Sequence, residues 1–326
     1  MAKHFLEIAD FTTEELQLLL TESAHLKEIY RRGGRDHSLA GKSAAMLFEK
    51  PSSRTRISFQ VGMTQLGGSS IYIRPEDIGG LGKREPVSDL TRVLNGYVDV
   101  IVARVFSHET LREMAQWSKV PVINALSDLA HPCQAMADIL TIREHFATLP
   151  GRKLAFIGDG NNVARSLALA CVKLGLRFAL AAPAGYELPA DFVAELKREA
   201  GAGQLEFTTD PYQAVKGADV IYTDTWVSMG QEDEKQIRLK AFAGYTLDMK
   251  LLKAAGPHAK VMHCLPAYRG LEITEEVMES PQSVIFDEAE NRLHFQRALL
   301  KHLVMANVEA PVKGTRMKIQ QPKNGF

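Results

Sequence analysis

Hydroxyl and guanidinium side chains gather in one short segment, Ser52-Ser53-Arg54-Thr55-Arg56, where a loop leads into a predicted helix at 55–66. The start of a helix presents free backbone N–H groups and a partial positive charge, which together bind phosphate. Arginine adds a planar fork that matches phosphate oxygens. The segment therefore indicates an anion site, and a helix cap with solvated arginines is the competing interpretation.

Polar side chains also stand at two other predicted junctions. His131-Pro132-Cys133-Gln134 leads into a helix, and its imidazole and amide groups could hydrogen-bond a small polar group. A capping turn with Pro132 in the first helical position explains the same residues. Asn161 and Asn162 follow a predicted strand at 154–157. Asn162 could bind the charged groups of an amino acid, or the pair could simply cap a helix.

Two more segments follow predicted strands. Asp224, after the strand 220–223, opens a segment that runs through Ser228-Met229-Gly230. Its carboxylate is well placed to meet an ammonium group, although an aspartate at such a place is more often a cap or a solvated acid. His263-Cys264-Leu265-Pro266 ends another strand. Its Leu-Pro step can hold a cis bond and direct carbonyl groups inward, and Cys264 is either reactive or buried and inert.

Two cofactor hypotheses find little support. The pairs His131/Cys133 and His263/Cys264 offer metal ligands, but their spacing matches no zinc-finger or zincin pattern. Gly158-Asp159-Gly160 is similar to a dinucleotide-binding loop, yet Val163 replaces the third glycine of that fingerprint. We therefore expect neither a metal ion nor an organic cofactor.

Strands and helices alternate along the chain, which predicts an α/β protein with parallel sheets covered on both faces. The 326 residues suit two domains, and Leu149-Pro150-Gly151 breaks the pattern between a first domain at 1–149 and a second at 150–290. Ligands of such sheets bind beyond the carboxyl ends of the strands, where most of the segments above fall. Strands are predicted at 43–48, 69–73, 98–104, 120–124, 154–157, 178–181, 220–223 and 260–263, and a closing helix from about 291 to 306.

The composition excludes several classes of protein. Lys+Arg and Asp+Glu both number 39, so no net charge favours nucleic acid or an acidic membrane. The apolar runs are too short to span a bilayer. Three cysteines give no disulfide framework and suit a reducing compartment. With no targeting pattern at its start, the chain is expected in the cytoplasm, and its basic, polar stretch 311–326 is expected to be a loose tail.

Taken together and in this order, the segments resemble the aspartate/ornithine carbamoyltransferase family. The matching motifs cover most of the chain, from about residue 40 to about 305. The resemblance implies two Rossmann-like domains, each a parallel sheet flanked by helices, with the C-terminal helix at about 291–310 packing back on the first domain. The motifs are Phe48-Glu49-Lys50-Pro51-Ser52-Ser53-Arg54-Thr55-Arg56, Ala103-Arg104, His131-Pro132-Cys133-Gln134 and His263-Cys264-Leu265-Pro266.

The resemblance also implies an activity, the transfer of a carbamoyl group from carbamoyl phosphate to an amine. Arg104 and His131 would act at the carbonyl oxygen together with Thr55, and Asp224 and Cys264 would manage the amine. The residues expected to bind carbamoyl phosphate are Ser52, Ser53, Arg54, Thr55, Arg104, His131, Gln134, Cys264, Leu265 and Arg292.

Within the family, the segment from Asp224 through Ser228-Met229-Gly230 looks like the branch that uses ornithine. Asn162, Asp224, Ser228 and Met229 would then hold ornithine, and the product would be citrulline, in arginine metabolism. A branch member acting on putrescine is the alternative. A nucleotide-dependent oxidoreductase and a family member without activity are two further alternatives.

The resemblance implies a homotrimer with sites between subunits. Three positions depart from the family pattern. Ser53 stands where threonine is frequent, which keeps the hydroxyl, and Arg165 stands where a smaller or uncharged residue is common. Gly80 stands where many members place a Gln or His that reaches a neighbouring subunit, so that contact is in doubt here, and Lys83 or Arg84 is the candidate to replace it.

Overall fold

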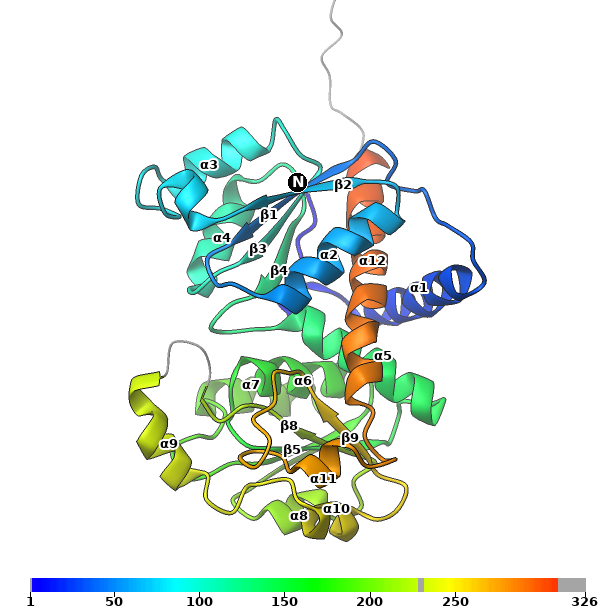
Figure 1. Cartoon of the computed structure of the whole chain (residues 1–326), viewed down its shortest axis with the longest axis vertical. Coiled ribbons are helices and arrows are strands. Elements are labelled where there is room, and N and C mark those ends of the chain that lie inside the picture. The colour runs from blue at the N-terminus through cyan, green and yellow to red at the C-terminus, as the bar shows by residue number, and fades with distance from the viewer. Residues whose placement is uncertain (1, 228–231, 310–326) are drawn as a thin grey trace, which may run out of the picture.

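A computed structural model describes residues 2–227 and 232–309. Two parallel sheets share one chain, and helices lie on both faces of each sheet (Figure 1). This confirms the α/β architecture expected from the sequence. In the described ranges, no helix is long and apolar enough to cross a membrane.

The first sheet has the strand order β2-β1-β3-β4. Its strands are continuous apolar runs because both faces are covered. Alternate side chains of β1 point to opposite faces. Ala45 and Leu47 pack toward α3 and α4, whereas Met46 and Phe48 pack toward α1, α2, α5 and α12. The elements are η1 (Ile8–Asp10), α1 (Thr13–Arg31), β1 (Ser43–Phe48), α2 (Ser53–Gln65), β2 (Ser69–Ile73), η2 (Pro75–Ile78), α3 (Val87–Leu94), β3 (Val100–Arg104), α4 (His108–Trp117), β4 (Val122–Leu126) and α5 (Pro132–Phe146).

The second sheet has the order β7-β6-β5-β8-β9. Ala155 and Ile157 of β5 face α8, α10 and α11, and Leu154 and Phe156 face α6 and α7. The elements are β5 (Lys153–Ile157), α6 (Asn162–Lys173), β6 (Arg177–Ala181), α7 (Ala190–Glu199), β7 (Leu205–Thr208), α8 (Pro211–Val215), β8 (Val220–Thr223), η3 (Glu232–Glu234), α9 (Lys235–Ala241), α10 (Met249–Ala255), β9 (Lys260–His263), α11 (Glu275–Met278) and α12 (Ile285–Glu309).

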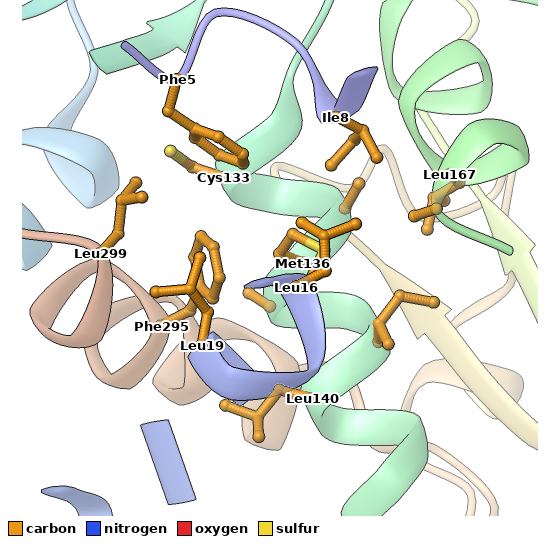
Figure 2. Close-up of a cluster of buried hydrophobic side chains, with 14 of the residues drawn as sticks. Phe5, Ile8, Leu16, Leu19, Cys133, Met136, Leu140, Leu167, Phe295 and Leu299 are labelled. Carbon is orange, nitrogen blue, oxygen red and sulfur yellow. The ribbon is translucent and has the colours of Figure 1, made fainter. Parts of the chain in front are cut away.

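The last helix, α12, returns from the second sheet and packs against α1, α2 and α5 (Figure 1). Figure 2 shows the core at this junction, where segments far apart in the sequence meet. The expected packing of the C-terminal helix is therefore confirmed. The core residues in that view are Phe5, Ile8, Leu16, Leu19, Cys133, Met136, Leu140, Leu167, Phe295 and Leu299.

Some boundaries differ from the prediction. Helix α12 begins at Ile285 rather than near 291, because no glycine or proline interrupts 285–291 and Asp287 and Glu288 suit the first turn of a helix. The strand β7 was not predicted, because it is half-buried along its length and carries no apolar run. Strands β3 and β4 each begin two residues later than expected. The division at 149/150 stays a prediction.

Candidate active site

A cavity of about 1020 Å³ opens at the carboxyl ends of β1, β3, β5, β8 and β9. Both sheets contribute to it, as expected for ligand sites of parallel sheets. Ser228 and Met229, which the sequence also nominated, lie outside the described residues. The twelve other predicted site residues all line this cavity: Ser52, Ser53, Arg54, Thr55, Arg104, His131, Gln134, Asn162, Asp224, Cys264, Leu265 and Arg292.

The N-terminus of α2 forms one wall. Ser52 is the N-cap, and its hydroxyl accepts a hydrogen bond from the backbone N–H of Thr55 at 3.4 Å. The helix is 13 residues long, and the residues of its first turn line the cavity. Its free N–H groups and its partial positive charge therefore lie at the cavity wall. This geometry supports the predicted anion site.

Three arginines, Arg54, Arg104 and Arg292, line the same region. Within residues 2–227 and 232–309, none of them forms an ion pair with a carboxylate. Burial, together with the charges of Arg292 and Arg54, lowers the pKa of Arg104 to about 10. Buried like charges without counter-ions are costly. The site is therefore built to receive an anion.

His131 lies at the start of α5, beside this cluster of arginines. Burial, with the charges of Arg292 and Arg104, holds the pKa of His131 well below its ordinary value. The ring is therefore neutral, and one of its nitrogens carries a proton that can be donated. Its backbone N–H is fixed by the hydroxyl of Ser166 at 2.9 Å.

Asp224 and Cys264 line the part of the cavity that follows β8 and β9. The thiol of Cys264 donates to Oδ1 of Asp224 at 3.0 Å. Burial, and next the negative charge of Asp224, raises the pKa of Cys264 well above its ordinary value, so the thiol is neutral. Asn161 Nδ2 donates to Oδ2 of Asp224 at 2.8 Å. Asn162 instead donates to the carbonyl oxygen of Ser127 at 2.6 Å.

Sequence reasoning did not nominate several residues of this cavity. Asn161 caps α6 and also donates to the carboxylate of Asp224, whereas Asn162 donates to a backbone carbonyl. Arg238 is buried and donates from Nη1 to Asp159 at 2.7 Å and to the carbonyl oxygen of Trp226 at 3.0 Å. Arg238 also pairs with Glu234 four residues away, as a surface helix residue would, so nothing in the sequence indicated its contacts in the cavity, which are 79 and 12 residues away.

A metal site would need His263 with Asp224 and Cys264, whose ligand atoms lie within 4.8 Å of one another. The Nδ1 atom of His263 accepts the backbone N–H of Leu265 at 2.9 Å, so Nε2 carries the proton and donates it to Glu272 at 3.2 Å. Neither ring nitrogen keeps a lone pair for a metal ion.

The glycine of the dinucleotide-like loop has a structural reason of its own. A Cβ atom at Gly160 would lie 2.5 Å from the backbone of Glu187 and Leu188. Glycine is thus required there by close packing against another segment of the same chain. That requirement explains the glycine without a pyrophosphate.

The fold and the cavity define an α/β enzyme with two parallel sheets, whose shared cavity is lined by arginines and by polar side chains. Family models match both halves. Residues 3–144 match the carbamoyl-P binding domain of aspartate/ornithine carbamoyltransferase, and residues 150–303 match its Asp/Orn binding domain.

Individual relatives cover nearly the whole chain. An ornithine carbamoyltransferase of Methanoculleus marisnigri is 49% identical over 95% of this chain and 100% of its own length. An ornithine carbamoyltransferase of Methanocorpusculum labreanum is 50% identical over 93% of this chain and 99% of its own length. The solved ornithine carbamoyltransferase from Pyrococcus furiosus is 46% identical, covers 94% of this chain and 97% of its own, and superposes with a TM-score of 0.90. The chain belongs to the aspartate/ornithine carbamoyltransferase family and is a carbamoyltransferase.

Proposed function

We propose that the protein transfers the carbamoyl group of carbamoyl phosphate to the side-chain amine of L-ornithine, giving L-citrulline and phosphate. The observation that carries the proposal is the presence of two unlike groups in one cavity. Its lining includes three arginines that have no carboxylate partner among the described residues, and also the Asp224–Cys264 pair. Relatives named ornithine carbamoyltransferase over 93% or more of this chain support it.

The phosphate of the donor would bind at the N-terminus of α2, to Ser52, Ser53, Arg54 and Thr55. Arg104 would bridge the phosphate and the carbonyl oxygen. The Oγ1 atom of Thr55 accepts a hydrogen bond from Nη2 of Arg292 at 2.9 Å, so the hydroxyl hydrogen of Thr55 can be donated to the substrate. Arg292 thereby orients Thr55 toward the donor.

The carbonyl oxygen of the donor gains negative charge as the amine attacks. Arg104, Thr55 and neutral His131 would donate to it. Donors fixed in advance around a developing oxyanion contribute about 3 kcal/mol each to lowering the barrier. The side-chain oxygen of Gln134 and the backbone carbonyls near Cys264 and Leu265 would accept hydrogen bonds from the carbamoyl NH2 group.

Ornithine presents an amine similar to that of lysine, whose ordinary pKa is about 10.4. Asp224 and Cys264 would orient it so that the neutral form attacks, with Asn162, Ser228 and Met229 holding the rest of the amino acid. The C–N bond forms and a tetrahedral intermediate results. The C–O bond to phosphate then breaks, phosphate leaves with the electron pair, and the surplus proton of the nitrogen passes to it. No metal or organic cofactor is required, because the donor carries its own leaving group.

The finer assignments rest on the family. We propose a carbamoyl phosphate domain at 1–149 that α12 rejoins, an ornithine domain at 150–290, and closure of the two to exclude water. We also propose a homotrimer in the cytoplasm that serves arginine metabolism. In that trimer, Lys83 or Arg84 would take over the intersubunit contact that Gly80 cannot make.

The test is citrulline formation from carbamoyl phosphate and ornithine, with putrescine, acetylornithine and aspartate assayed in parallel. Turnover with ornithine alone supports the proposal. Turnover with putrescine instead would overturn the assignment of Asp224 and the segment after it, and would keep the phosphate site. No turnover with any amine would overturn the proposed function.

A further inference from the structure

Three groups fix the side-chain amide of Gln134 from two sides. Its Nε2 donates to Oδ1 of Asp138 at 2.8 Å and to Oε1 of Glu288 at 3.1 Å. Its Oε1 accepts Nη1 of Arg292 at 2.8 Å. Gln134 is fully buried and lines the cavity. None of the proposed steps above uses Asp138 or Glu288.

The orientation of this amide follows from its partners. A guanidinium group can only donate, so the oxygen of Gln134 must face Arg292. The NH2 group must therefore face the two carboxyl groups, which accept both of its hydrogens. The carbonyl oxygen has two lone pairs, of which Arg292 uses one. The other is available to an N–H donor in the cavity.

Asp138 and Glu288 are two buried acids that contact the same amide. Both side chains are completely buried, and both accept a hydrogen bond from Gln134 Nε2. Oδ2 of Asp138 has no hydrogen-bond donor among the described residues. Two buried carboxylates in contact cannot both be ionised. Burial is the main cause that raises the pKa of Asp138 to about 7 and the pKa of Glu288 well above its usual range, so at neutral pH this pair of acids holds a proton.

Glu288 also connects this pair to the acceptor side of the site. Its Oε1 accepts the phenol O–H of Tyr222 at 3.1 Å, and burial raises the pKa of that phenol so that it remains a donor. Its Oε2 accepts the backbone N–H of His263 at 2.8 Å, one residue before Cys264. One pair of acids thus ties α5, β8, β9 and α12 together behind the cavity.

We propose that Asp138 and Glu288 are positioning residues that lock the Gln134 amide with its carbonyl oxygen toward the donor, and that this lock gives the site its preference for carbamoyl phosphate over acetyl phosphate. The proposal rests on the proposed function. Carbamoyl phosphate carries an NH2 group where acetyl phosphate carries a CH3 group, and the two compounds are otherwise alike. A site that offers a fixed acceptor to the NH2 group rejects the donor that lacks it, because the acceptor is then left unpaired.

The test compares Asp138→Leu with Asp138→Asn. Leucine removes one of the two acceptors of the Gln134 NH2 group and leaves only Glu288. It replaces a buried acid by an apolar side chain with the same branching, so the variant introduces no new buried charge. Asparagine keeps an acceptor for Gln134 and offers an N–H to Glu288. Each variant and the parent are assayed for kcat/KM with carbamoyl phosphate and for competitive inhibition by acetyl phosphate, with thermal unfolding as the control for folding.

We expect Asp138→Leu to lower kcat/KM for carbamoyl phosphate about tenfold, which is the size of one net hydrogen bond, and to leave the inhibition constant of acetyl phosphate within about twofold. Asp138→Asn should keep both constants near those of the parent. Equal losses for the two ligands, or no loss for either, would overturn the positioning role. If Asp138→Leu does not fold, Glu288→Gln tests the same role with the same two measurements. The two oxygens of Glu288 accept from Gln134 and from the backbone of His263, and a glutamine has only one oxygen to offer. A parent protein that makes no citrulline would overturn the proposed function instead.

Discussion

The thiol sulfur of Cys264 lies 3.0 Å from Oδ1 of Asp224, although the two residues follow different strands of the second sheet. The thiol donates, and the carboxylate keeps it protonated. This pair places a neutral donor and an anion side by side where an amine is proposed to attack. The chemistry of the cysteine can therefore be tested without substrate.

Cys264 should react slowly with iodoacetamide. Its pKa is raised first by burial and then by Asp224, so very little thiolate exists at pH 7 to 8. The Asp224→Asn variant removes the charge and lowers the pKa, so alkylation should become faster, while burial still keeps it slower than that of a free thiol. Mass spectrometry of a timed reaction gives both rates. Rapid alkylation of the parent at pH 7 would contradict the neutral thiol.

Asn161 serves both as a helix cap and as a partner of Asp224, and two variants separate these roles. Asn161→Ser keeps a capping hydroxyl for Val163 and Ala164 but is too short to donate to Asp224, and it places no second charge beside that carboxylate. It should fold with near-normal stability and lose about tenfold or more in kcat/KM for ornithine. Asn161→Ala should show the same kinetic loss and about 1 kcal/mol less stability. Normal ornithine kinetics in Asn161→Ser would refute the positioning of Asp224.

Arg54 is proposed to bind the phosphate of the donor. Arg54→Ala should lower kcat/KM for carbamoyl phosphate about 10- to 150-fold, the size of a hydrogen bond to a charged group. Arg32→Ala is the matched control, since Arg32 is exposed and, within the part of the chain that the structure describes, forms an ion pair with Glu28 alone, four residues away. Steady-state kinetics at varied carbamoyl phosphate measures both. Full activity in Arg54→Ala would remove this residue from the phosphate site.

His294 makes stability depend on pH. Burial lowers its folded pKa to about 4, whereas the unfolded value is about 6.5. The unfolded state therefore binds the proton first, and stability present above pH 6.5 is lost as the pH falls toward 4. The loss attributable to this group is up to about 3 kcal/mol.

The control for that prediction is His294→Gln, which keeps a donor for Glu290 but does not titrate. Urea unfolding of both proteins between pH 7 and 4 should show a flatter dependence in the variant. Parallel curves would show that His294 is not protonated in the unfolding transition.

The sequence by itself determined the strands, their parallel arrangement and the segments that end at one edge of the sheets. These features depend on local apolar runs and on the order of elements, which a sequence displays directly. It therefore nominated twelve residues that line the cavity. It did not reveal β7, because a half-buried edge strand lacks the apolar run that marks a strand.

Only the tertiary structure decided which partners meet. Gln134 and Asp138 stand four residues apart, as do Glu288 and Arg292, so each pair shares a helix face. Nothing in the sequence shows that these two faces meet, with Gln134 donating a hydrogen bond to Glu288 across 154 residues. Such contacts arise from the packing of α12 on α5, and burial then sets the charge of each group. For that physical reason, the sequence nominated Gln134 and Arg292 but neither Asp138 nor Glu288, and only the fold determined how these four groups are oriented.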